Sequence, residues 1–194
     1  MTVSALIMAG GEGRRMGGKD KGLMMCQGKA FIDHVIDALR PQVDNIAISA
    51  NRNIEEYAQR TPHVFADARQ WQGLGPLAAL GTAASDIQFA KADWLLIVPC
   101  DTLRLPPDLV ERFLQTAGKS FSTHAFYAET PMKQHYSVMF VRPQTLQSTP
   151  AYLQTGLRTM RGWLEQEHAL PVTFPLEEAF VNYNSPQDME AVPC

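Results

Sequence analysis

The chain has 194 residues, of which 45% are hydrophobic and 19% are charged, and its formal net charge is -3. This length and composition predict one folded domain over residues 1–194 and exclude a largely disordered chain. The weak negative charge excludes a general basic surface for nucleic acid or an anionic membrane, so an anionic ligand must meet a local cluster of cations.

The predicted elements alternate between strands and helices. The first is an apolar run over residues 3–9, which ends at Gly10 and Gly11 and predicts a buried strand that leads into a loop. Apolar residues at helical spacing predict a helix that starts at Phe31 and stops before Pro41. The remaining expected elements are, in chain order, strands over 45–49 and 63–66, a helix over 76–84, a buried strand over 94–98, two strands within 122–141 and a helix over 157–168.

This alternation predicts an α/β fold with three layers, in which helices cover both faces of a mainly parallel, Rossmann-like sheet. Parallel strands bring their carboxyl ends to one edge, where ligands of such sheets bind. The expected strand ends carry glycines or polar residues at 9–11, at 49–51, at Asp67 and at 100–101. The sequence therefore predicts a ligand site at that edge.

Two patterns concern the compartment. The cysteines Cys26, Cys100 and Cys194 are far apart and lack CxxC spacing, which favours a reducing cytoplasm over a disulfide framework. The apolar run at the amino terminus has no preceding positive charge, and no segment approaches the ~20 apolar residues that cross a bilayer. We therefore expect a cytoplasmic protein with no membrane partner.

Residues 10–22 contain six glycines and four cations, a density found nowhere else in the chain. Glycines allow the backbone to approach a ligand closely, and the cations supply positive charge, so the segment favours a triphosphate site over a solvated flexible loop. Two known phosphate motifs fail here. The dinucleotide pattern GxGxxG is broken by Met16, and the P-loop pattern would end on Asp20, which has no hydroxyl for a metal ion.

Residues 7–21 resemble the signature of the molybdenum cofactor guanylyltransferases, within the wider group of nucleotidyltransferases that activate sugars, terpenoid precursors and cofactors. The resemblance covers nearly the whole chain. At position 49, however, this chain has Ser49 where many members of that family have asparagine. Further matching segments are residues 49–52, 66–67, 75–77, 99–102 and 180–186.

The resemblance implies transfer of GMP from GTP to the phosphate of molybdenum-loaded molybdopterin, with release of pyrophosphate and with Mg²⁺ as cofactor. It also implies transient contact with molybdenum-insertion and molybdoenzyme-delivery proteins. Arg15, Lys21 and Asp101 would be catalytic, Asp101 would also hold the metal, and Asn182 and Asn184 would receive molybdopterin. The nucleotide would be bound by Met8, Ala9, Gly10, Gly11, Lys21, Ser49, Asn51, Asp67 and Asp101.

Several of these residues also have simpler interpretations. Asp101 follows a buried apolar strand and suits hard Mg²⁺, but it could instead cap a turn at Thr102. Asp67 could start a turn. Lys21 could form a surface ion pair with its neighbour Asp20, and such pairs contribute little.

Four other functions stay open on the sequence alone: CTP-dependent transfer to molybdopterin, transfer to a sugar phosphate, non-catalytic nucleotide binding by a regulator, and a dinucleotide oxidoreductase. The broken GxGxxG pattern argues against the oxidoreductase. A regulator would not need an acceptor site, so release of pyrophosphate in the presence of a phosphorylated acceptor distinguishes it from an enzyme.

Overall fold

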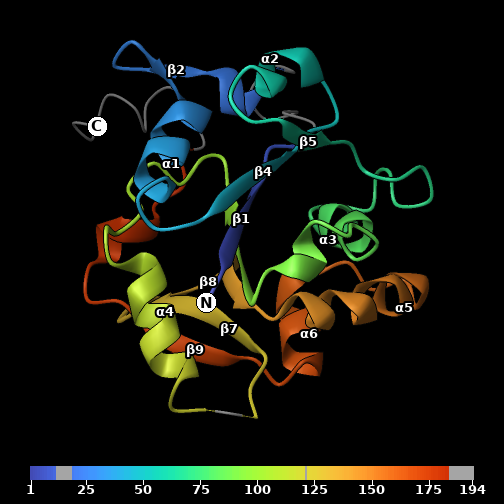
Figure 1. Ribbon diagram of the computed structural model, residues 1–194, viewed down its shortest axis with the longest axis vertical. Helices are drawn as coiled ribbons and strands as arrows, with labels where there is room; N and C mark the ends of the chain where they lie inside the picture. Colours follow the sequence, from blue (N-terminus) through green and yellow to red (C-terminus); the bar gives the residue numbers. More distant parts are fainter. Residues whose placement is uncertain (12–18, 121, 184–194) are drawn as a thin grey trace.

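The computed structural model describes residues 1–11, 19–120 and 122–183 (Figure 1). A sheet of seven strands runs through the middle of the molecule. In spatial order its strands are β5 (His63–Phe65), β4 (Asn45–Ser49), β1 (Val3–Met8), β6 (Trp94–Pro99), β8 (Lys133–Val141), β7 (Ala125–Thr130) and β9 (Leu170–Thr173).

The strands β5, β4, β1 and β6 are parallel neighbours. Met8 lies opposite Ser49 in β4 and opposite Pro99 in β6, so three strands end at the same level. On the other side of β6, strand β8 pairs antiparallel with both β6 and β7, and β9 pairs parallel with β7. β1 and β6 are buried along almost their whole length, as expected for strands that are covered on both faces.

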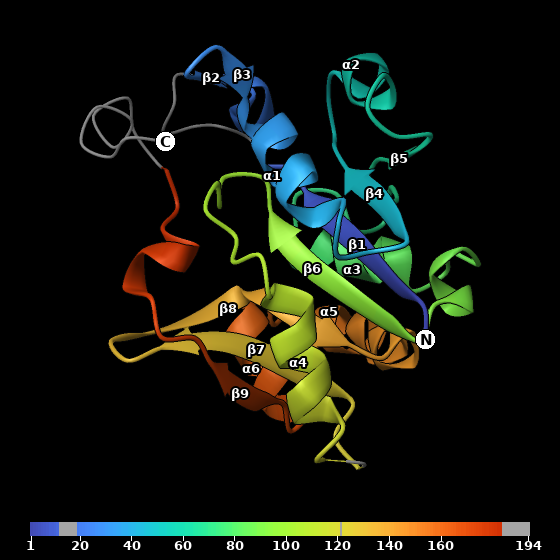
Figure 2. The same cartoon turned by 60° about the vertical axis from the view of Figure 1, so that its left-hand side comes forward.

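Helices cover both faces of this sheet, and each face has its own apolar cluster (Figures 1 and 2). α1 (Phe31–Leu39) and α4 (Leu109–Ala117) pack on one face. α3 (Leu77–Ala83), α5 (Thr149–Gln154) and α6 (Met160–Gln166) pack on the other. The predicted three-layer α/β fold with a mainly parallel sheet is confirmed.

The smaller elements lie around this frame. α2 (Ile54–Ala58) follows β4, and a short hairpin of β2 (Met25–Cys26) and β3 (Lys29–Ala30) precedes α1. The short 3₁₀ helices are η2 (Lys21–Leu23), η3 (Phe89–Lys91), η4 (Pro143–Ser148) and η5 (Glu177–Phe180).

Besides the β2–β3 hairpin and the short 3₁₀ helices, four elements were absent from the prediction: α2, α4, α5 and β9. α2 and α5 have only five and six residues, which is too short for a clear periodic pattern. β9 has one buried residue among its four, because it lies at the edge of the sheet. α4 differs, since its buried residues Leu109, Val110, Phe113 and Ala117 have helical spacing and were therefore predictable.

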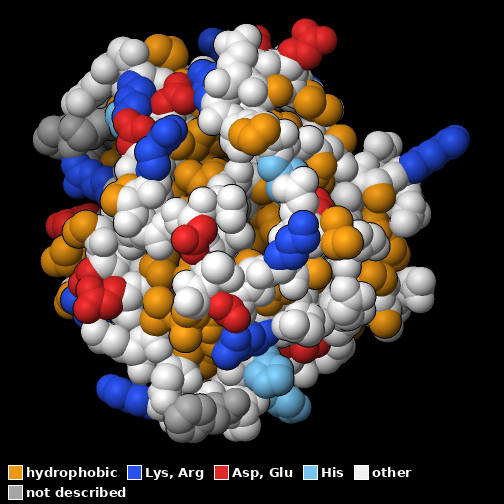
Figure 3. Space-filling model, in the orientation of Figure 1, with side chains coloured by type: hydrophobic (Ala, Val, Ile, Leu, Met, Phe, Trp, Pro, Cys, Tyr) orange, Lys and Arg blue, Asp and Glu red, His pale blue; other side chains and the backbone are white. Residues whose placement is uncertain are grey.

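Charge is mixed rather than separated on the surface. On the face seen in Figure 3, basic and acidic side chains are interspersed among apolar and polar ones. This mixture agrees with the small net charge. An anionic ligand must therefore be bound by a local group of cations and hydrogen-bond donors, and not by the electric field of the whole surface. Among the helices of the described residues, none combines the length and apolar character that a membrane crossing requires.

Candidate active site

A cavity of about 1070 Å³ opens where β5, β4, β1 and β6 end. Its floor is made by strand ends that the parallel register brings together. Ala9 N–H donates to the Ser49 carbonyl at 2.7 Å, and Cys100 N–H donates to the Met8 carbonyl at 3.1 Å, so the ladder continues to the cavity. Sites for small ligands commonly measure ~300–1,000 Å³, so this one has room for a nucleotide and part of a second substrate.

All nine residues predicted to bind nucleotide line this cavity, although they come from five separate segments of the chain. They are Met8, Ala9, Gly10, Gly11, Lys21, Ser49, Asn51, Asp67 and Asp101. Two other predicted residues, Arg15 and Asn184, lie outside the described residues.

Asn182 lies beside the cavity but is not part of its described lining. It forms an isolated bridge with Thr102, whose hydroxyl donates to Asn182 Oδ1 at 2.9 Å. The next residue, Tyr183, donates its N–H to the Asp101 carbonyl at 3.2 Å. The segment with Asn182 and Tyr183 is thus attached directly to Asp101 and Thr102, which follow β6.

Lys21 and Asp101 meet at the cavity from opposite sides. Lys21 is the first residue of η2, Asp101 follows β6, and the ammonium pairs with Asp101 Oδ2. Asp20 is therefore not the partner of Lys21, and the simple interpretation as a neighbouring surface pair is wrong. The two side chains are only 20% and 10% exposed, so their charges are less screened than those of a surface pair.

The other oxygen of Asp101, Oδ1, is buried and has no hydrogen-bond partner among the described residues. It therefore does not cap a turn at Thr102. A buried carboxylate oxygen without a donor suits a hard divalent cation, which prefers oxygen ligands and takes one or two carboxylates together with substrate phosphates. The described residues contain no group of three His, Cys, Asp or Glu side chains that could hold a metal by itself, so phosphates and water would complete the coordination.

Asn51 joins Asp67 to the start of the glycine-rich loop, which is residues 10–22. Its amide nitrogen donates to Asp67 Oδ2 at 2.7 Å and to the Gly10 carbonyl at 3.2 Å, while its oxygen accepts from Asp67 N–H at 2.9 Å. A Cβ at Gly10 would lie 2.9 Å from the Asn51 amide nitrogen, so a larger residue there would displace the Asn51 amide. Asp67 is thereby fixed through both its side chain and its backbone.

Burial raises the pKa of the Asp67 carboxyl above its ordinary value, and polar contacts from Asn51 and Ser49 offset this only in part. Asp67 Oδ1 and the Ser49 hydroxyl are buried without a well-formed hydrogen bond to a described residue. Both atoms are in residues that line the cavity. They are available to a ligand that donates hydrogen bonds.

Cys100 lies between the strand end and Asp101 and is buried as a free thiol. Burial and the neighbouring Asp101 carboxylate raise the pKa of this thiol above its ordinary value. It therefore stays protonated at neutral pH and is not suited to act as a nucleophile.

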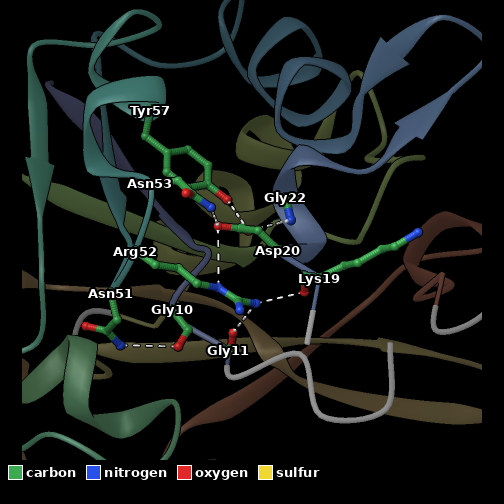
Figure 4. A network of polar contacts seen from close by, with 9 residues as sticks. All are labelled: Gly10, Gly11, Lys19, Asp20, Gly22, Asn51, Arg52, Asn53 and Tyr57. Atoms are coloured by element: carbon green, nitrogen blue, oxygen red, sulfur yellow. Dashed lines mark hydrogen bonds and ion pairs between the residues drawn. The ribbon is translucent and has the colours of Figure 1, made fainter. Parts of the chain in front are cut away.

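Several lining residues are missing from the prediction. Arg52 directly follows Asn51, and its guanidinium lies between Gly11 and Lys19 (Figure 4). Its position within the matching segment 49–52 was a signal that could have drawn attention to it. The far wall includes Gln72, Ser137 and Met160, for which the sequence carries no comparable signal.

Comparisons with known proteins agree with this geometry. The family model of the MobA-like NTP transferase domain matches residues 5–170. A molybdenum cofactor guanylyltransferase from Neisseria meningitidis serogroup C / serotype 2a is 55% identical over 190 residues, which cover 98% of this chain and 99% of that protein. One from Shewanella woodyi is 39% identical over 191 residues, covering 98% and 95%.

A solved structure shares the fold at low sequence identity. It is the molybdopterin-guanine dinucleotide biosynthesis protein A from Archaeoglobus fulgidus, with a TM-score of 0.73 and 20% identity, covering 97% of this chain and 95% of that one. The strand order and layers described above are therefore those of a fold known from experiment.

Asp67→Asn is expected to stabilise the protein at neutral pH while impairing its use of nucleotide. A raised pKa means that the folded state binds the proton more tightly than the unfolded state, so the charged carboxylate lowers stability at pH 7. The amide removes this charge and can still accept from Asn51. We expect a gain of about 0.5–2 kcal/mol in the free energy of unfolding at pH 7, together with a higher KM for the nucleotide.

The gain in the free energy of unfolding should shrink as the pH falls towards 3.8, the ordinary pKa of this carboxyl. The wild-type carboxyl then becomes protonated in both the folded and the unfolded state. Urea unfolding at several pH values measures it, with Asp37→Asn as a control, since that side chain is 59% exposed. A loss of stability that is equal at every pH would show that the Asp67 carboxylate stabilises the fold, and an unchanged KM would remove it from the nucleotide site.

Proposed function

The chain belongs to the molybdenum cofactor guanylyltransferase family of MobA-like NTP transferases, and from this premise we propose that it transfers GMP from GTP to the phosphate of molybdenum-loaded molybdopterin. One observation carries the proposal. Lys21, in the glycine-rich loop, and Asp101, after the end of β6, meet in a cavity made by four parallel strand ends. A cation, a carboxylate and loop backbone are thus gathered where a triphosphate can be held.

In the proposed reaction an oxygen of the acceptor phosphate attacks the α-phosphorus of GTP. The bond between the α-phosphorus and the bridging oxygen to the β-phosphorus breaks, and pyrophosphate leaves with the electron pair. The acceptor phosphate is already ionised at neutral pH, so no side chain has to remove a proton. The contribution of the protein is to position the triphosphate and to stabilise negative charge, which is the main requirement in phosphoryl chemistry.

Different residues are assigned to the triphosphate and to the metal ion. We assign the triphosphate to the backbone of Gly10 and Gly11 and to the Lys21 ammonium, with Arg15 as a second cation predicted from the family resemblance. We assign Mg²⁺ to Asp101, whose Oδ1 has no hydrogen-bond partner among the described residues. When bound, Mg²⁺ would neutralise charge on the phosphate oxygens.

The acceptor side of the cavity lies toward residues 182–183. We propose that molybdopterin approaches from the carboxyl-terminal segment, where Asn182 is attached to Thr102 next to Asp101. Asn184 stays a prediction from the sequence. The cytoplasmic location and the transient contacts with molybdenum-insertion and molybdoenzyme-delivery proteins also stay predictions.

Asp101→Asn is expected to give a folded protein whose turnover falls by at least ~10²–10³, the scale for loss of one preorganised stabiliser of transition-state charge. The side chain keeps its volume but loses the charge that would hold Mg²⁺. Pyrophosphate release at saturating Mg²⁺ measures the effect. Asp86→Asn, which alters an acid paired with His63 away from the cavity, is the matched control. Turnover near that of the wild type would remove Asp101 from the proposed metal site.

The base preference should favour GTP over CTP. Guanine offers an N1–H and an exocyclic amine as donors, and the acceptors at the strand ends include Asp67 Oδ1, which is buried without a well-formed hydrogen bond. A nucleotide that leaves such groups unpaired loses ~1–3 kcal/mol for each. Two such losses predict a preference of at least ~100-fold in kcat/KM.

The assay measures Mg²⁺-dependent pyrophosphate release from GTP, CTP, ATP and UTP, with and without molybdenum-loaded molybdopterin. We expect release that depends on the acceptor and is fastest with GTP. Equal efficiencies or a preference for CTP would move the chain to the cytidylyltransferases. Nucleotide binding without pyrophosphate release would favour the regulator.

A further inference from the structure

Three consecutive side chains after β4 contact the glycine-rich loop (Figure 4). Asn51 binds the Gly10 carbonyl, as described above. Arg52 Nη2 donates to the Lys19 carbonyl at 2.7 Å and makes a longer contact of 3.4 Å with the Gly11 carbonyl. A single guanidinium therefore connects the two described parts of the loop through Gly11 and Lys19, which are eight positions apart in the sequence.

Arg52 also forms an ion pair with Asp20. The Arg52 Nε lies 3.6 Å from Asp20 Oδ2, and the Asp20 side chain is only 6% exposed. The same carboxylate accepts from the Tyr57 hydroxyl at 2.6 Å, from the Asn53 amide at 2.9 Å and from Gly22 N–H at 3.2 Å. A buried carboxylate with this many donors has one preferred orientation, because any other leaves polar groups unpaired.

The surroundings of Asp20 are built for this contact. Tyr57 is fully buried, and burial together with its hydrogen bond to Asp20 raises the pKa of its phenol, so it stays a donor at neutral pH. A Cβ at Gly22 would lie 2.4 Å from the Tyr57 hydroxyl oxygen. Only glycine at this position leaves room for the hydroxyl to reach Asp20.

Lys21 lies between Asp20 and Gly22, both of which belong to this network, while its ammonium pairs with Asp101. A displacement of Asp20 would therefore displace the Lys21 backbone. We propose that Arg52, held by Asp20, is a positioning residue of the guanylyl transfer proposed above: it fixes the two ends of the loop so that Gly10, Gly11 and Lys21 meet the triphosphate together.

A different role for Arg52 is direct binding of a phosphate, since it lines the cavity. Its charge, however, faces the Asp20 carboxylate, and its Nη2 donates to main-chain carbonyls. The two roles predict opposite results for Asp20→Asn. If Arg52 is a positioning residue, Asp20→Asn lowers kcat because Arg52 loses its ion-pair partner. If Arg52 binds a phosphate directly, the same variant lowers the KM for GTP because the guanidinium no longer faces the Asp20 carboxylate.

The first test measures kcat and KM for GTP in Arg52→Lys, Asp20→Asn and the double variant. Lysine keeps the positive charge but cannot bridge two carbonyls and a carboxylate with a rigid planar group. We expect each single variant to lose about 10- to 100-fold in kcat, the scale for misplacement of reacting groups, with KM changed by less than about threefold. The double variant should lose little more than either single one, since both changes break one network.

Arg60→Lys is the matched control. Arg60 also pairs with a carboxylate, at 2.7 Å from Asp33 Oδ1, and donates to a main-chain carbonyl, that of Glu56. It lies outside the described lining of the cavity. We expect Arg60→Lys to have a kcat close to that of the wild type. The comparison then shows that the loss in Arg52→Lys comes from the loop contacts of Arg52 and not from replacing any paired arginine.

A second measurement needs no turnover. The N–H groups of Gly22, Leu23 and Met24 are hydrogen-bonded within or next to η2, and their exchange with deuterium can be followed by NMR. We expect faster exchange in Arg52→Lys and Asp20→Asn than in the wild type and in Arg60→Lys. If the wild type releases no pyrophosphate from GTP, the proposed function fails, while these exchange rates still decide whether Arg52 holds the loop.

Three results would overturn the positioning role. They are unchanged exchange at residues 22–24, wild-type kcat in Arg52→Lys, and a lower KM for GTP in Asp20→Asn. The last result would identify Arg52 as a phosphate ligand.

Discussion

The parallel pairing of β1 with β4 on one side and β6 on the other is the constraint on which the rest of the site depends. It sets Met8 opposite Ser49 and Pro99, so the loop after β1, the polar residues after β4 and the acid after β6 open onto one cavity. Packing on both faces fixes the register, since a slip of one residue would move every side chain of a strand from one apolar cluster into the other. Side chains far apart in the sequence are thereby placed together, and several of them bond directly, as Lys21 does with Asp101 and Asn51 with Asp67.

Three buried aspartates at this edge show how one residue type serves different purposes. Asp20 is surrounded by donors and organises the loop. Asp67 is held by Asn51 but keeps one oxygen without a well-formed bond. Asp101 pairs with Lys21 through one oxygen and has no described hydrogen-bond partner at the other. Buried acceptors without donors lower stability, so their presence at the cavity indicates ligand binding rather than folding.

The sequence was most informative where a buried strand ends in a polar residue. The run over 94–98 predicted β6, and the rule for parallel sheets then placed Asp101 and Asp67 at one edge. The partner of Lys21 was not predictable in this way, because adjacency favoured Asp20 and only the folded chain brings Asp101 close. Arg52 was not predicted although it lies in the matching segment 49–52, because its contacts with the Gly11 and Lys19 carbonyls follow from the fold and not from a residue pattern. Arg15, Asn184 and the extent of the domain remain predictions.

The most direct test of guanylyl transfer is to follow the label from GTP that carries ³²P at the α- or the γ-phosphate, with molybdenum-loaded molybdopterin as acceptor. Transfer of GMP predicts that the α-label enters the molybdopterin product and that the γ-label leaves as pyrophosphate. The γ-label in the product, or its release as inorganic phosphate without any labelled product, would show that the β–γ bond is broken instead, and would contradict the function proposed for this cavity.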